Sequence, residues 1–181
     1  MVLCHPHPLY GGSMLTPVIL TVEAAFRAAG FTTLAFNFRG VGGSEGTHGE
    51  GHTEIADVAG ALTHLKAALD AQPDLVAVAG YSFGSHVGGR AASADPSVNF
   101  YLGVAPVLAR YDYGFLAGLR GRVALIAGAR DEFSDPVRLE TLAAGLPGRP
   151  WLRVLETDHF FAESLEDLAG ACDDAITWAL G

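Results

Sequence analysis

The stretch Val78-Ala79-Gly80-Tyr81-Ser82-Phe83-Gly84 is the strongest indication of the fold of this 181-residue chain. It places Ser82 in a Gly-x-Ser-x-Gly pattern, directly after an apolar run and directly before a helical one. A strand that turns sharply into a helix strains its corner residue, and side chains at the two flanking glycine positions would collide across the turn. The pattern therefore predicts a strand-turn-helix unit in which the Ser82 hydroxyl stands clear of a sheet as a candidate nucleophile.

A serine hydroxyl needs partners before it can attack a carbonyl group. A base must take its proton, and the base works best when a carboxylate orients it. Both residue types follow predicted strands later in the chain: Asp131 comes after the apolar run 123–128, and His159 comes after the run 151–155. We therefore expect Ser82, Asp131 and His159 to meet at the carboxyl edge of one sheet.

The chain order Ser, Asp, His, with each residue just past a strand, resembles the α/β-hydrolase superfamily. The matching features extend from about residue 3 to about residue 161, and they are most similar to compact, lidless bacterial members near the dienelactone hydrolase group and related small esterases. The resemblance implies that Ser82, Asp131 and His159 form a catalytic triad. Dienelactone hydrolases themselves use a cysteine nucleophile, so their substrate is not carried over to this chain.

Two other acids lie in the loop that holds Asp131. Glu132 and Asp135 are alternatives for the residue that orients the base. The superfamily places its acid in a Gly-x-x-Asp turn, and the turn from Gly128 to Asp131 matches that spacing. Asp135 precedes a proline, which is typical of a helix N-cap. These arguments favour Asp131.

The N-terminal sequence Leu-Cys-His-Pro-His-Pro-Leu-Tyr-Gly-Gly resembles the superfamily loop that supplies one backbone N–H of the oxyanion hole. Pro6 and Pro8 have no N–H, so the donor is His7 or Leu9, and alignment on the His-Pro pair favours His7. Phe83, which follows the nucleophile, is expected to supply the second N–H.

Strand-like and helical patterns alternate along the whole chain. Strands are predicted at 2–5, 31–38, 75–79, 99–104, 122–128 and 151–155, and helices at 14–29, 53–70, 83–94, 135–145 and 162–180. This alternation predicts a single α/β domain over residues 1–181, with a mostly parallel sheet flanked by helices on both faces.

The chain departs from the superfamily pattern in two places. The segment 105–122 is too short for a helical lid domain, although its aromatic residues suit either a short rim over a pocket or ordinary packing. The two strands that usually come first are missing before residue 3, so we expect either a start further upstream or a trimmed sheet. A trimmed sheet would leave the strand at 32–38 as an apolar edge, which favours a homodimer.

Composition and charge narrow the possible binding partners and the cellular location of the protein. A net charge of −9 and a pI near 5.1 disfavour nucleic acid and anionic membrane surfaces. The sequence has neither a cleavable leader pattern nor an apolar run long enough for a membrane span, so a cytoplasmic protein is expected. The two cysteines, Cys4 and Cys172, are predicted to be buried free thiols.

The other histidines suggest neither a metal nor a rival base. His5 is expected to brace the oxyanion loop, and the pairs His5/His7 and His48/His52 lack a matching cluster of acids or cysteines. We therefore expect no metal and no cofactor. The prediction is a serine hydrolase acting on small-molecule esters or thioesters through an acyl-enzyme. The alternatives are an acyltransferase or peptidase with the same triad, and a noncatalytic binding protein with the same fold.

Overall fold

Six parallel strands form one sheet in this computed structural model, which describes all of residues 1–181. The sheet order is β2-β1-β3-β4-β5-β6, and each neighbouring pair is parallel. The strands are β1 (Val2–Cys4), β2 (Leu34–Ala35), β3 (Ala77–Tyr81), β4 (Phe100–Val104), β5 (Arg122–Gly128) and β6 (Trp151–Leu155). The expected parallel α/β sheet is confirmed.

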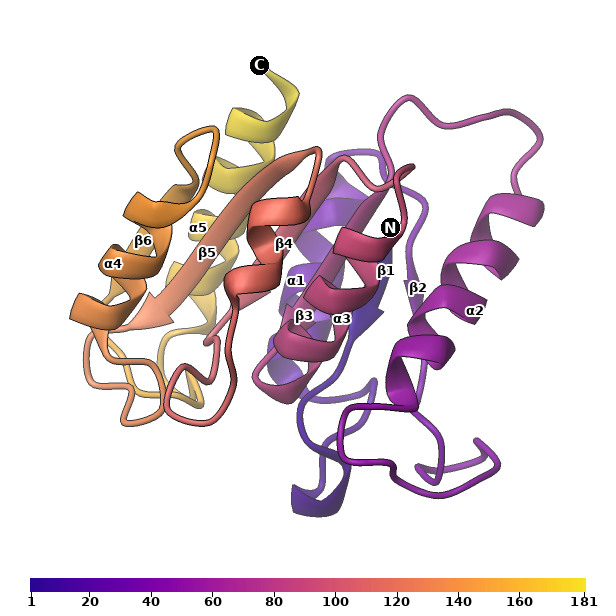
Figure 1. Ribbon diagram of the computed structural model, residues 1–181, viewed down its shortest axis with the longest axis horizontal. Helices are drawn as coiled ribbons and strands as arrows, with labels where there is room; N and C mark the ends of the chain where they lie inside the picture. The colour runs from indigo at the N-terminus through magenta and orange to yellow at the C-terminus, as the bar shows by residue number, and fades with distance from the viewer.

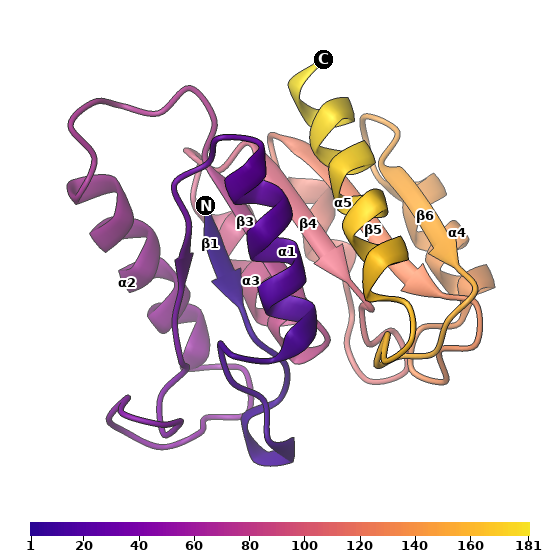
Figure 2. The same ribbon diagram turned by 180° about the vertical axis from the view of Figure 1, so that it is seen from behind.

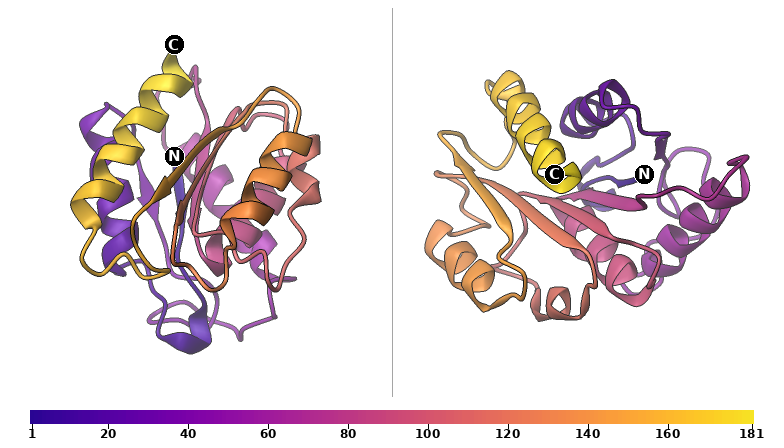
Figure 3. Two further views of the ribbon diagram at one scale, coloured as in Figure 1. Left: turned by 90° about the vertical axis from the view of Figure 1, so that its left-hand side faces the viewer. Right: turned by 90° about the horizontal axis from the view of Figure 1, so that it is seen from above.

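Helices cover both faces of the sheet, as expected. On one face α1 (Pro17–Ala28) and α5 (Leu165–Leu180) lie side by side (Figure 2), while α2 (Glu54–Ala67), α3 (Phe83–Ala94) and α4 (Pro136–Gly145) cover the other (Figure 1). Figure 3 shows the three layers edge-on. The two core layers hold 23 and 21 buried residues, so both faces are filled to a similar extent.

The strands divide their side chains between the two layers by simple alternation. Along β4, Phe100 and Leu102 pack in the layer under α1 and α5, whereas Tyr101 packs in the layer under α3. All five residues of β4 are buried, as are all five of β3. Central parallel strands covered on both faces are expected to be apolar throughout, which is why these runs stand out in the sequence.

The direction of the chain reverses across the sheet between β1 and β3. From β1 the chain crosses outward to β2 and then returns to β3 on the other side of β1. The loops that leave the carboxyl ends of β1 and β3 therefore diverge and open a crevice, which is where ligands bind in open parallel sheets. Residues 5–12 and Ser82 lie on these two loops.

Several predicted elements are shorter in the structure, and two of the differences have a clear physical reason. The strand expected at 31–38 pairs with β1 only over Leu34–Ala35, because beyond this point the Phe38 N–H turns away to the ring of His5. The helix expected at 14–29 begins at Pro17, which fits the first helical turn because it has no N–H to leave unpaired. Short 3₁₀ turns that were not predicted lie at Pro8–Tyr10 and Gly114–Gly118.

The segment between β4 and β5 contains only the short 3₁₀ turn and no lid helix. None of the helices combines the length and the apolar character needed to cross a bilayer. Cys4 and Cys172 are both buried and free, as predicted. Burial raises the pKa of the Cys172 thiol to about 12, so this thiol is inert.

The bare edge of β2 leads to a prediction about assembly. Its outer side has no neighbouring strand, and such an edge offers unpaired backbone groups to a second chain. We predict a dimer of the 18.9 kDa chain through this edge. Thr32→Lys, which places a charge beside the edge, is expected to give a monomer in light scattering, whereas Thr141→Lys on α4 leaves the dimer intact. A wild-type monomer at every concentration would contradict the prediction.

Candidate active site

Ser82 lies at a strained corner between β3 and α3. Its backbone has φ 55° and ψ −120°, in the positive-φ region that residues other than glycine rarely adopt. The flanking glycines make this corner possible: a Cβ added at Gly80 would lie 2.1 Å from the carbonyl oxygen of Gly84, and one at Gly84 would lie 2.1 Å from that of Cys4. The turn predicted from the sequence is therefore present.

Three predicted side chains form one chain of hydrogen bonds. His159 Nε2 lies 2.9 Å from Ser82 Oγ, and His159 Nδ1 lies 2.8 Å from Asp131 Oδ2. The three residues come from loops after β3, β5 and β6, and all are buried. The carboxylate fixes the tautomer, because a proton on Nδ1 leaves Nε2 free to accept the serine hydroxyl proton.

The loop after β5 selects Asp131 over the other two acids. The second carboxylate oxygen of Asp131, Oδ1, accepts hydrogen bonds from the backbone N–H groups of Phe133 at 2.8 Å and Ser134 at 3.1 Å. Glu132 is exposed to solvent, and Asp135 caps α4 by accepting the N–H of Val137 at 2.8 Å. The preference for Asp131, and the N-cap predicted for Asp135, agree with this arrangement.

A hydrogen bond to its backbone also holds His159 in place. The Tyr81 hydroxyl donates to the His159 carbonyl oxygen at 3.0 Å, so the last residue of β3 fixes the loop after β6. Asp158, the preceding residue, accepts the N–H groups of Phe160 and Phe161 at 3.0 and 3.1 Å. Asp158 therefore shapes this loop, while the ring nitrogens of His159 bond to Asp131 and Ser82.

The backbone N–H groups of Phe83 and His7 donate no hydrogen bond within the protein. Leu9, the alternative donor to His7, uses its N–H on His7 Nδ1 at 3.2 Å. Gly12 lets the loop fold tightly, because a Cβ there would lie 2.2 Å from the carbonyl oxygen of Pro6. The free N–H groups are thus those of the two residues that the sequence favoured.

His5 braces this loop, as expected. It is fully buried, and its Nε2 accepts the Phe38 N–H at 2.9 Å while Nδ1 donates to the Pro6 carbonyl oxygen at 2.7 Å. These partners require the neutral ring. Burial lowers the pKa of His5 from 6.5 to about 4 and keeps the ring neutral, although the bond to Pro6 acts in the opposite direction.

A second histidine and a buried carboxylate, which no sequence pattern indicated, support the loop from behind. Glu54 is fully buried and accepts the N–H groups of Gly49 at 2.6 Å and Gly51 at 2.9 Å. His48 Nδ1 lies 3.0 Å from Glu54 Oε1, and the His48 ring packs 4.9 Å from that of His7. No motif spacing links these residues, because the loop at 40–53 folds back only in three dimensions.

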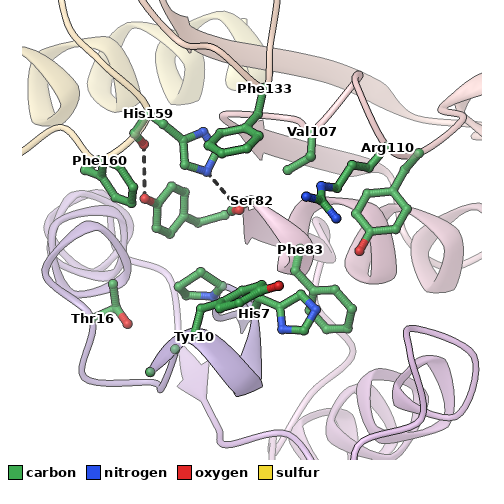
Figure 4. A pocket seen from close by; sticks show the side chains of 15 residues that line it. His7, Tyr10, Thr16, Ser82, Phe83, Val107, Arg110, Phe133, His159 and Phe160 are labelled. Atoms are coloured by element: carbon green, nitrogen blue, oxygen red, sulfur yellow. Dashed lines mark hydrogen bonds between the residues drawn. The ribbon is translucent and has the colours of Figure 1, made fainter.

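A pocket of about 490 Å³ opens above Ser82 (Figure 4). This volume suits a small or medium ligand. Six aromatic side chains line it: Tyr10, Tyr81, Phe83, Tyr111, Phe133 and Phe160. Of the aromatic residues in the segment 105–122, Tyr111 lines the pocket, whereas Tyr113 is buried in the core and Phe115 packs against that core. The structure contains no group of three or more His, Cys, Asp or Glu side chains arranged to hold a metal ion.

The chain belongs to the Alpha/beta hydrolase family, whose model matches residues 1–180. An uncharacterised protein of Rickettsia prowazekii is 30% identical over 95% of this chain and 76% of its own length. An α/β serine hydrolase without a lid from Xanthomonas campestris is 31% identical with a TM-score of 0.89, covering 99% of this chain and 82% of that one. An α/β serine hydrolase homologue from Coxiella burnetii is 27% identical with a TM-score of 0.88, covering 96% and 82%. The resemblance to lidless family members is confirmed.

The close approach at Gly84 leads to a prediction of stability. Gly84→Ala drives a methyl group into the β1 backbone, and we expect a loss of about 3 kcal/mol in the free energy of unfolding. Gly60→Ala on α2 is the matched control: its Cβ meets nothing within 4 Å, and it is expected to stabilise the protein by about 0.5 to 1 kcal/mol. Urea titrations of both variants test this, and equal stabilities would contradict it.

The buried neutral ring of His5 predicts a pH dependence of stability. Its pKa is about 4 in the folded protein, against 6.5 for an unperturbed histidine, so the unfolded chain binds more protons between these values. Stability is then full above pH 6.5 and falls as the pH drops towards 4, by up to about 3 kcal/mol for this residue. In His5→Gln the amide oxygen replaces Nε2 as the acceptor, so urea titrations at pH 8 and 4.5 should show a smaller fall than in the wild type. Equal falls would contradict the prediction.

Proposed function

We propose that this family member is a serine hydrolase that cleaves carboxylic esters or thioesters of small or medium substrates through an acyl-enzyme. The continuous hydrogen-bonded chain from Ser82 through His159 to Asp131 is the observation that carries the proposal. It lies at the floor of an aromatic pocket, beside two backbone N–H groups that have no other partner. A protein that only binds its ligand has no need of this combination.

In the proposed reaction, Ser82 Oγ attacks the carbonyl carbon while His159 Nε2 takes the hydroxyl proton. The N–H groups of Phe83 and His7 stabilise the oxyanion, and Asp131 stabilises the protonated imidazole. Collapse of the tetrahedral intermediate breaks the bond to the alcohol or thiol, which receives the proton from Nε2. Water, deprotonated by the same nitrogen, then attacks the acyl-enzyme and releases the acid and free Ser82.

The size of the pocket favours small-molecule esters over polypeptides. The site has a volume of about 490 Å³, a size that suits a small or medium ligand. We also propose a cytoplasmic setting, because both cysteines are free and buried, as in proteins of reducing compartments.

The first test is intact-mass analysis after exposure to a fluorophosphonate. The wild type should gain the mass of one adduct, because Ser82 is activated, while Ser82→Ala should gain none. Ser164→Ala, which removes the hydroxyl ahead of α5, is the control and should label like the wild type. Folded wild-type protein that takes no adduct would contradict the proposal.

Turnover of p-nitrophenyl esters then tests the roles of the triad. Asp131→Asn should lower kcat by about 10⁴-fold, because an amide no longer fixes the productive tautomer of His159. Addition of alcohol or amine acceptors, followed by product analysis, distinguishes hydrolysis from acyl transfer.

A further inference from the structure

Arg110 is the one lysine or arginine side chain that lines the pocket, and no Asp or Glu lines it. It takes part in no ion pair, although the chain carries 20 acidic residues against 11 lysines and arginines. Figure 4 shows its guanidinium pointing into the pocket towards Ser82. A cation without a partner in a pocket with aromatic walls is suited to bind an anionic group of a ligand.

The backbone that carries Arg110 is tied to the nucleophile through buried groups. The Arg110 N–H donates to the Val107 carbonyl oxygen at 3.1 Å, and the Val107 N–H donates to the Tyr113 hydroxyl at 3.0 Å. That hydroxyl lies 2.7 Å from Ser85 Oγ, which in turn donates to the Ser82 carbonyl oxygen at 2.6 Å. Arg110 itself is exposed, but its main chain is held by this hydrogen-bonded turn.

The positive charge in the pocket comes from Arg110 and is not shared with His7. Burial, with smaller contributions from His48 and Arg110, lowers the pKa of His7, so its ring is neutral near pH 7. One guanidinium balances one negative charge, which fits a carboxylate better than a doubly charged phosphate.

The proposed mechanism indicates which part of the substrate meets this charge. His159 must return its proton to the leaving group, so the leaving group lies beside Nε2. In the view of Figure 4, Arg110 enters from the opposite side of Ser82, where the acyl group would lie. Resting on the proposed function, we propose that Arg110 selects esters whose acyl group carries a carboxylate, such as half-esters of short dicarboxylic acids.

The test compares two esters with the same leaving group. We expect the wild type to cleave the p-nitrophenyl half-ester of glutaric acid with a kcat/KM about 10- to 100-fold above that of p-nitrophenyl valerate, the gain typical of a charge-assisted hydrogen bond. Arg110→Gln should remove most of this ratio, Arg110→Lys should retain part of it, and Arg110→Glu should reverse it. Arg138→Gln, an exposed arginine on α4 outside the pocket, should leave the ratio unchanged.

A binding measurement separates the two proposals. Ser82→Ala cannot form an acyl-enzyme, so calorimetry with monophenyl glutarate and with phenyl valerate reads the preference without turnover. Tighter binding of the anion, lost in Ser82→Ala/Arg110→Gln, supports the role of Arg110 even if the wild type cleaves no ester. Equal binding of the two ligands, or an unchanged kcat/KM ratio in Arg110→Gln, overturns it while leaving the hydrolase proposal standing.

Discussion

The contact between the first turn of α3 and the end of β1 is the constraint on which the site depends. Gly84 lies so close to the carbonyl oxygens of Cys4 and His5 that a Cβ would come within 2.1 and 2.4 Å of them. This approach sets the corner at Ser82 directly beside the loop that begins at His5. The nucleophile and both free N–H groups are thereby positioned by one backbone contact, and not by three independent loops.

The sequence predicted the parts of the fold that are determined locally. The helix at 83–94 and the strands at 122–128 and 151–155 have the predicted bounds, because each is a continuous apolar or helical pattern with clear breaks. Ser82, Asp131 and His159 could be found because each follows such a strand. The strand around Leu34 was overestimated, because its pairing with β1 ends at Ala35 and the Phe38 N–H bonds to the ring of His5, a side-chain contact that the apolar pattern does not reveal.

Residues that act through distant contacts could not be predicted. Glu54 and His48 lie behind His7, and Tyr113 lies under the turn that holds Arg110. Glu54 falls in the first turn of an amphipathic helix, where an acidic residue is ordinarily a solvated one, and Tyr113 belongs to an aromatic segment in which Tyr111 also lies. Their roles depend on how loops fold back onto the sheet edge, which hydrophobic periodicity does not encode.

Both buried carboxylates of the site, those of Asp131 and Glu54, are stabilised by backbone N–H groups. Asp131 accepts the N–H groups of Phe133 and Ser134, and Glu54 accepts those of two glycines, so neither is balanced by a lysine or arginine. Backbone N–H groups stabilise a carboxylate without bringing a cation into the pocket. Because no acid of the site draws it into an ion pair, the guanidinium of Arg110 remains available to a ligand. The same arrangement explains how a chain with a net charge of −9 presents a positive charge beside its candidate nucleophile.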